Sequence, residues 1–157
     1  MTEKEQIIGR IEDMYNAYAE NIYYFLLTKL RSKPDAEEVL QNVFLNIADI
    51  KEKVLLIKEP RKYLFTAARN EAINYVKAGK NRRNDESLDE LLFEPAGKTV
   101  NNEEALEIEK AVLKLPDDQR SVVIMKFYRG FTFEEIAEAM DIPPNTAASK
   151  IDTLWII

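Results

Sequence analysis

The sequence contains no cysteine and no histidine among its 157 residues, and it has only 4 glycines and 6 prolines. Without cysteine the chain forms no disulfide and no thiolate metal site, and without histidine it lacks the commonest metal ligand and the usual general base. So few glycines and prolines argue against a turn-rich all-β fold. We therefore expect no cofactor, no metal and no enzymatic activity, although carboxylate-based catalysis is not excluded by composition.

Long hydrophobic runs are also missing. No apolar stretch approaches the roughly 18 residues that a membrane helix needs, and residues 1–10 are polar, without a signal-peptide pattern. We expect a cytoplasmic protein with no membrane span. Hydrophobic residues still make up 46% of the chain, which is enough to build a core.

Charge is distributed unevenly along the chain. The total is −6, which by itself argues against binding to nucleic acid. Residues 58–83, however, hold 8 basic and 2 acidic side chains, whereas residues 84–110 hold 2 basic and 9 acidic ones. A single basic segment in an acidic chain is a candidate polyanion site, although a solvated helix face explains the charge equally well.

The periodicity of apolar residues predicts an all-α fold of two small helical domains joined by an acidic linker. Residues 84–102 have little periodicity and form the predicted linker, with one short turn near 88–93. The domains are predicted at 8–83 and 103–157. Expected helices cover residues 11–30, a segment starting at Ser32 or Asp35, 60–79, 106–115, 117–128, 133–140, and a segment from Asn145 or Thr146 to the end.

Residues 132–155 have the spacing of a helix-turn-helix unit. Thr132 and Glu135 form a predicted capping box, and a turn at 141–144 separates two short helices. In such a unit the start of the second helix contacts bases in the major groove. The same pattern also fits any helical hairpin. The residues in that position are Pro144, Asn145, Thr146, Ser149 and Lys150.

Two groups of motifs together resemble bacterial sigma factors. Residues 115–120 (LPDDQR), 131–140 (FTFEEIAEAM) and 142–147 (IPPNTA) look like sigma region four. Residues 35–44 (DAEEVLQNVF) and 61–75 (RKYLFTAARNEAINY) resemble the polymerase-binding and promoter-melting helices of region two. The order of these motifs, without a region three, resembles the extracytoplasmic-function (ECF, group four) sigma factors. The resemblance implies an RNA polymerase subunit that selects promoters, and an anti-sigma factor as its regulator.

The resemblance implies that the helix of residues 35–44 binds core RNA polymerase, through a clamp coiled coil of the largest subunit. Acidic and amide side chains on one face suit a basic partner helix. This predicted polymerase surface consists of Asp35, Glu37, Glu38, Gln41 and Asn42.

The resemblance also implies that residues 54–83 bind the minus-ten promoter element. Asn70 and Asn74 share a helix face, and their amides can both donate to and accept from a base edge. The loop at 54–59 is in the position that captures a flipped base in this family. We expect core packing for Tyr63 and leave open which aromatic side chains stack on bases. The predicted phosphate contacts are Lys58, Arg61, Lys62, Arg69, Lys77, Lys80, Arg82 and Arg83.

Binding to the minus-thirty-five element is less well supported by the sequence. The residues assigned to it are Arg120, Arg129, Thr132, Asn145, Thr146, Ser149 and Lys150, with Lys126 as a further basic neighbour. The family has several basic residues after this point, but here Ile151 to Ile157 are mostly apolar and include Asp152. A truncated end, packing on the protein's own core and coverage by a partner are competing explanations.

Two other functions remain open from the residues alone. A helix-turn-helix regulator that acts without polymerase would bind duplex DNA unaided and would not need the surface at residues 35–44. A helical adaptor without nucleic-acid function would show no salt-dependent DNA binding.

Overall fold

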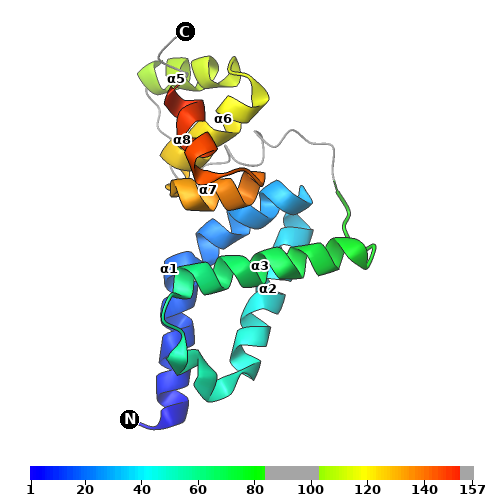
Figure 1. The fold of residues 1–157 in the computed structure, drawn as a ribbon, viewed down its shortest axis with the longest axis vertical. Coiled ribbons are helices and arrows are strands. Elements are labelled where there is room, and N and C mark those ends of the chain that lie inside the picture. Colours follow the sequence, from blue (N-terminus) through cyan, green and yellow to red (C-terminus); the bar gives the residue numbers. More distant parts are fainter. Residues whose placement is uncertain (84–102, 153–157) are drawn as a thin grey trace. The chain divides into compact units, whose positions relative to one another are not determined.

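The computed structural model describes residues 1–83 and 103–152, which form two compact units on either side of the gap. Every element in these ranges is a helix, as predicted (Figure 1). The predicted linker at 84–102, its short turn, and residues 153–157 lie outside the described residues. Within 1–83 and 103–152, no helix combines the length and the apolar character that crossing a membrane requires.

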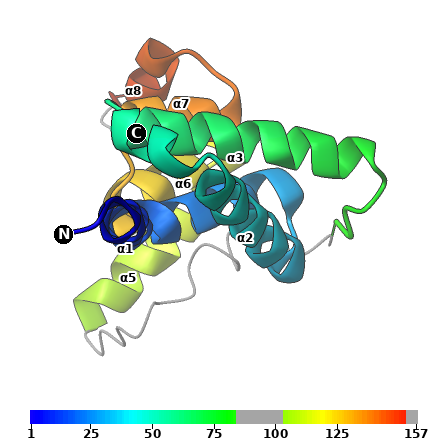
Figure 2. The ribbon, with the colours of Figure 1, turned by 90° about the horizontal axis from the view of Figure 1, so that it is seen from below.

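Unit 1 is built from three α-helices and one short 3₁₀ helix. They are α1 (Glu3–Leu30), α2 (Lys33–Asp49), η1 (Lys51–Leu56) and α3 (Pro60–Lys77). Helix α3 crosses both α1 and α2 (Figures 1 and 2), and all three pairs pack against one another. An edge-to-face contact of Phe25 with Phe65, with ring centroids 5.2 Å apart, lies in the core between α1 and α3.

Helix α1 begins eight residues earlier than its apolar periodicity predicts. Thr2 and Glu5 form a capping box, in which the Thr2 hydroxyl accepts from the Glu5 amide at 3.2 Å. The added turns are largely exposed, so they carry no apolar stripe that the sequence pattern would reveal. The predicted starts of the next two helices are confirmed, because Ser32 caps α2 and Pro60 occupies the first turn of α3.

Tyr63 is not a core residue, so our expectation for it was wrong. Its side chain is 39% exposed, whereas Phe65 and Tyr75 on the same helix are buried. The buried positions Leu64, Ala68 and Ala72 define the inner face of α3. Tyr63 lies one residue before that face and therefore points toward the surface.

Unit 2 contains α5 (Glu103–Leu113), α6 (Asp117–Val123), η2 (Ile124–Tyr128), α7 (Phe133–Met140) and α8 (Pro144–Asp152). The single helix predicted at 117–128 changes at Ile124 into a π-helical turn, closed by a 3.1 Å bond from the Arg129 amide to the Ile124 carbonyl. A π-turn adds one residue per turn, which sequence periodicity does not anticipate.

The helix-turn-helix unit forms as predicted. The capping box of Thr132 and Glu135 starts α7, and Asp141 ends it in the left-handed conformation, with φ of 56°. Helix α8 starts at Pro144, one residue before the expected position. Phe131 and Ile136 are buried in the core of this unit.

Asp35 is the centre of a buried polar cluster in unit 1. Its carboxylate is fully buried and accepts hydrogen bonds from the Tyr75 hydroxyl at 2.9 Å, the Asn81 amide at 3.0 Å and the Arg82 backbone amide at 2.6 Å. Asn81 also donates to the carbonyl of Leu30 at 2.9 Å. The cluster therefore ties together the end of α1, the start of α2, the end of α3 and the segment that follows it.

The hydrogen bonds in this cluster set the protonation states of its members. Burial alone would raise the pKa of Asp35, but the bonds from Arg82, Asn81, Tyr75 and Ser32 outweigh it and hold the pKa below its usual value. Burial and the two neighbouring carboxylates, Asp35 and Glu38, raise the pKa of Tyr75 to about 12. Asp35 is thus an anion and Tyr75 a neutral donor at neutral pH.

We expect Asp35→Asn to destabilise unit 1 in a pH-dependent way. Because the folded-state pKa of Asp35 is lowered, its charge stabilises the fold above an unfolded-state pKa of about 3.9, and this contribution is lost as the pH falls through the folded value. Thermal melting followed by circular dichroism should show the variant about 5–10 °C less stable at pH 7, with the gap closing below about pH 4. The matched control Asp49→Asn, at an exposed carboxylate in the same helix, should change little. A difference in melting temperature that does not change with pH would contradict a stabilising role for the charged form of Asp35.

Candidate nucleic-acid interface

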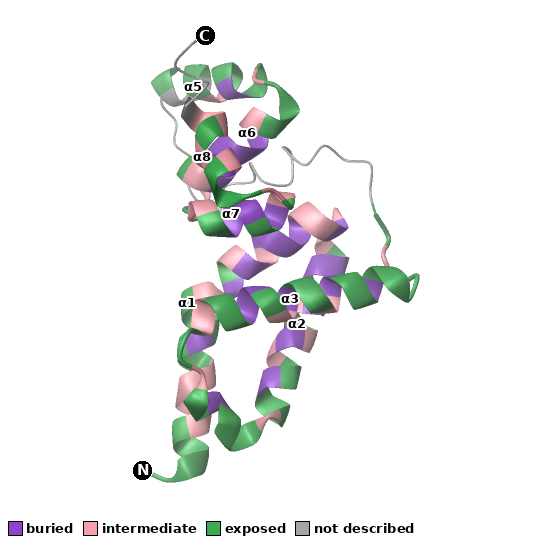
Figure 3. Cartoon of the chain, in the orientation of Figure 1, coloured by how far each residue is buried: buried purple, intermediate pink, exposed green. Residues whose placement is uncertain are grey.

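The outer face of α3 presents the two asparagines that the sequence singles out. Asn70 and Asn74 are both exposed, and their spacing of four residues puts them on one side of the helix. Figure 3 shows exposed and buried stretches alternating along α3. Two apolar side chains are also exposed on this helix, Ile73 at 41% and Val76 at 49%. The helix therefore offers amide groups and apolar surface together, a combination suited to contacts with unpaired bases.

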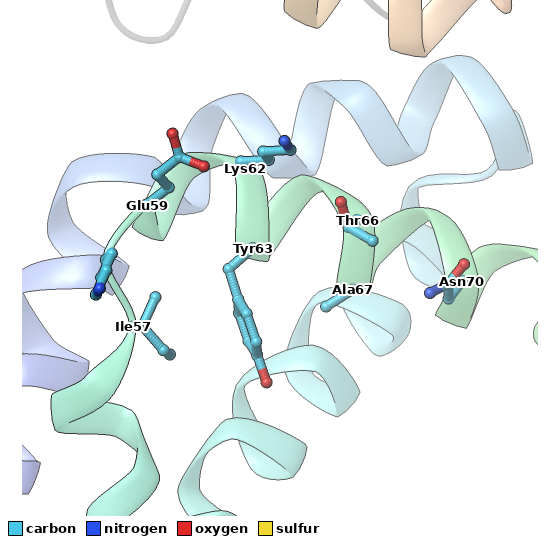
Figure 4. Close-up of a pocket in the computed structure, with 8 residues that line it drawn as sticks. Ile57, Glu59, Lys62, Tyr63, Thr66, Ala67 and Asn70 are labelled. Atoms are coloured by element: carbon cyan, nitrogen blue, oxygen red, sulfur yellow. The ribbon is translucent and has the colours of Figure 1, made fainter.

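A surface pocket of about 700 Å³ opens at the start of α3. Figure 4 shows the Tyr63 ring between Ile57 and Ala67, so these three side chains form an apolar wall. A volume of this order accommodates a planar ring system of the size of a nucleobase. The polar lining residues are Lys58, Glu59, Lys62, Thr66 and Asn70.

Tyr63 is the site residue that sequence reasoning missed. The available signal is its spacing, because Tyr63, Ala67, Asn70 and Asn74 follow one another at intervals of four, three and four residues and so share one helix face. An aromatic residue in register with two exposed asparagines belongs to the surface that they form.

The segment before α3 is held against α1. The side chain of Arg10 donates from Nη2 to the carbonyl of Ile57 at 2.8 Å. Val54 of η1 is fully buried, whereas Leu56 is 74% exposed. This anchoring fixes the backbone of the predicted base-capturing loop beside the pocket.

Most of the predicted phosphate contacts in unit 1 lie at the surface. Arg61 is the exception, since it is half-buried, and Arg82 is exposed but also pairs with Asp35 through its Nε at 3.3 Å. The exposed members of the set are Lys58, Lys62, Arg69, Lys77, Lys80, Arg82 and Arg83.

The predicted polymerase surface on α2 requires one correction. Glu37, Glu38 and Gln41 are exposed and Asn42 is half-buried, but Asp35 is inaccessible, because its carboxylate accepts bonds from within unit 1. Glu38 contacts solvent, and its Oε2 also lies 2.9 Å from the Tyr75 hydroxyl, as a second acceptor beside Asp35.

In unit 2, Arg120 also requires correction, because the side chain stabilises the fold. Its Nη1 donates to the carbonyls of Leu113 and Leu115 at 3.2 and 3.1 Å, and its Nη2 pairs with Asp117. Only 17% of the side chain is exposed. Arg120 thus satisfies carbonyls around the end of α5 and is not presented for a phosphate.

Other predicted contacts of unit 2 are also engaged within the unit. Lys126 lies over the Phe133 ring at 4.5 Å, Lys150 pairs with Asp118 at 3.5 Å, and the Thr132 hydroxyl caps α7. Asn145 and Ser149 are exposed, whereas Thr146 and Arg129 are half-buried. Residues 103–152 hold 11 acidic and 6 basic side chains, so this part of unit 2 carries a net negative charge.

In a comparison with known proteins, each of the two units matches a protein family of its own. Residues 14–83 match the family described as Sigma-70 region 2, and residues 105–151 match Sigma-70, region 4. The match to region 2 includes α2, η1 and α3, and the match to region 4 includes the helix-turn-helix unit.

Similar proteins include two ECF RNA polymerase sigma factors of Bacillus subtilis. SigX is 25% identical over 150 residues, covering 89% of this chain and 75% of that protein, and SigM is 26% identical over 135 residues, covering 84% and 82%. The ECF RNA polymerase sigma-E factor of Haemophilus influenzae is 26% identical over 139 residues, covering 80% and 74%. With both regions present in order and relatives that match along most of their length, the chain belongs to the sigma-70 family of RNA polymerase sigma factors, in its ECF group.

Proposed function

We propose that this chain binds core RNA polymerase through α2 and captures the melted minus-ten strand of a promoter with α3 and the pocket beside it. The observation that carries the proposal is the pocket itself. It is lined by Tyr63 and Asn70, it continues into the face that bears Asn74, and it lies within the basic segment at 58–83. The protein supplies binding and performs no bond chemistry.

The pocket offsets the energy needed to extrude a base. Removing a base from the duplex stack costs a few kcal/mol, and stacking on an aromatic side chain returns about 1–3 kcal/mol per base. Tyr63 supplies that ring, with Ile57 on one side of it. Asn70 at the rim and Asn74 one turn further along then read base edges through their amides.

The exposed lysines and arginines of unit 1 hold the backbone of the captured strand. They add affinity that depends on salt and not on sequence. Unit 2 contributes base contacts from Asn145, Thr146 and Ser149 at the start of α8, with little help from its cations. Promoter choice in this protein therefore depends mainly on unit 1.

The polymerase surface consists of Glu37, Glu38, Gln41 and Asn42. Its acidic and amide groups are complementary to a basic helix of the largest polymerase subunit. A regulator that acts without polymerase, or an adaptor without nucleic-acid function, would need neither this surface nor the pocket. From the family we further infer an anti-sigma factor as regulator and a cytoplasmic location.

Tyr63→Ala should weaken capture of the melted strand. Loss of one stacking platform of about 1–3 kcal/mol corresponds to a decrease in affinity of about 5- to 150-fold. The measurement is binding of reconstituted holoenzyme to a promoter fragment whose minus-ten region is already unpaired. Tyr63→Phe keeps the ring and should retain most of the affinity. Equal losses in both variants would assign the role to the hydroxyl and contradict stacking.

Replacing both Asn70 and Asn74 by alanine should reduce discrimination among minus-ten sequences. The amides contact base edges, whereas the phosphate contacts stay intact, so affinity for preferred strands should fall by about tenfold or more while affinity for mixed-sequence strands changes little. Selection from a pool of unpaired minus-ten sequences measures this difference. An unchanged preference would assign base reading to other residues.

Glu38→Lys should disrupt binding to core polymerase. Reversal of one charge at a complementary interface should reduce affinity by about tenfold or more, measured by competition with a labelled sigma factor for core enzyme. Glu12→Lys makes the same charge change on α1 and serves as the control. If both variants bind core normally, the α2 surface is not the polymerase contact.

A further inference from the structure

The four residues after the turn at the end of α3 follow a defined path. Gly79 adopts φ of 73°, which reverses the chain, and the Lys80 amide donates back to the Tyr75 carbonyl at 3.3 Å. Asn81 then binds both the Leu30 carbonyl and the Asp35 carboxylate. The segment Lys80 to Arg83 contains no regular secondary structure. It is nevertheless held in place by the hydrogen bonds of Lys80 and Asn81.

Arg82 is held by Asp35 at two points. Its backbone amide donates to Oδ2 at 2.6 Å, and its Nε lies 3.3 Å from Oδ1. Its side chain nevertheless remains 69% exposed. The contact therefore fixes the base of the guanidinium group while the remainder faces solvent. Lys80 and Arg83 are exposed on either side of this anchor.

We propose that Asp35 is a positioning residue for DNA binding: it holds the segment Lys80 to Arg83 against the start of α2, so that three cations are presented together to the phosphates of the melted strand. Tyr75 supports this role, because its hydroxyl lies 2.9 Å from Oδ1 and orients the carboxylate. The contact itself belongs to the fold of unit 1, whereas its use in DNA binding rests on the function proposed above.

The sign of the expected effect separates positioning from simple electrostatics. Asp35→Asn removes a negative charge that contacts Arg82, and by charge alone this should strengthen binding to DNA. Loss of the anchor has the opposite effect, because three separately mobile cations bind phosphates less well than three held in place. A decrease in DNA affinity on neutralising an acidic residue therefore supports positioning.

The first measurement tests the anchor without DNA or polymerase. Amide hydrogen exchange of Arg82, followed by NMR on the full chain, should be at least about tenfold faster in Asp35→Asn than in the wild type, because a charge-assisted bond is weakened. Tyr75→Phe, which removes only the hydroxyl, should give a smaller increase of about threefold and covers the case that the first variant does not fold. Asp49→Asn is the matched control. Unchanged Arg82 exchange in the folded variants would overturn the proposal.

The second measurement tests the consequence for DNA. The affinity of reconstituted holoenzyme for a short mixed-sequence single strand is measured over a range of salt concentrations. Each lost phosphate contact should flatten the logarithmic salt dependence by about 0.7. Arg82→Ala gives the reference loss, and Asp35→Asn should lower both affinity and slope by at least as much.

The possible results distinguish the positioning role of Asp35 from the proposed function in promoter binding. If Asp35→Asn lowers the DNA affinity but leaves the salt dependence unchanged, the variant only contains fewer folded molecules, and the positioning role of Asp35 is overturned. A DNA affinity that rises in Asp35→Asn also overturns this role. If the wild type shows no salt-dependent binding at all, the proposed function fails, while the exchange measurement still decides whether Asp35 anchors the segment.

Discussion

A carboxylate removed from water must be compensated by hydrogen-bond donors, and in unit 1 those donors come from distant parts of the chain. Asp35 is fully buried near the start of α2, yet its partners are Tyr75 at the end of α3 and Asn81 and Arg82 beyond it. Because an unpaired buried charge would be strongly destabilising, the three helices and the segment after α3 assemble in the one arrangement that supplies these donors. The position of the exposed segment after α3 therefore depends on an interaction in the interior of unit 1.

The two units use their basic side chains differently. In unit 1 most lysines and arginines of residues 58–83 lie at the surface, and Lys58 and Lys62 line the pocket that contains Tyr63. In unit 2, Arg120 binds the carbonyls of Leu113 and Leu115, Lys126 lies over Phe133, and Lys150 pairs with Asp118. Both units match sigma-70 regions, and they differ in how many of their basic side chains are held by contacts within the unit.

Sequence patterns predicted the features that depend on neighbouring residues. The capping box of Thr132 and Glu135, the proline at the start of α3 and the helix-turn-helix spacing are all local signals, and the structure confirms them. The resemblance to sigma factors implied that Asp35 belongs to the polymerase surface and Arg120 to the minus-thirty-five contacts, but both side chains bind groups within their own unit. Their actual partners are brought close only by folding, which periodicity does not encode. Tyr63 shows the converse error, since an aromatic residue was expected inside.

The Tyr75 hydroxyl has one proton and two acceptors. It lies 2.9 Å from Asp35 Oδ1 and 2.9 Å from Glu38 Oε2, and a hydroxyl donates to one oxygen at a time. Asp35 belongs to the buried cluster, whereas Glu38 is on the outer surface of α2. The carboxylates of Asp35 and Glu38 thus compete for a single donor, so a change at the exposed carboxylate alters the hydrogen bonding of the buried one.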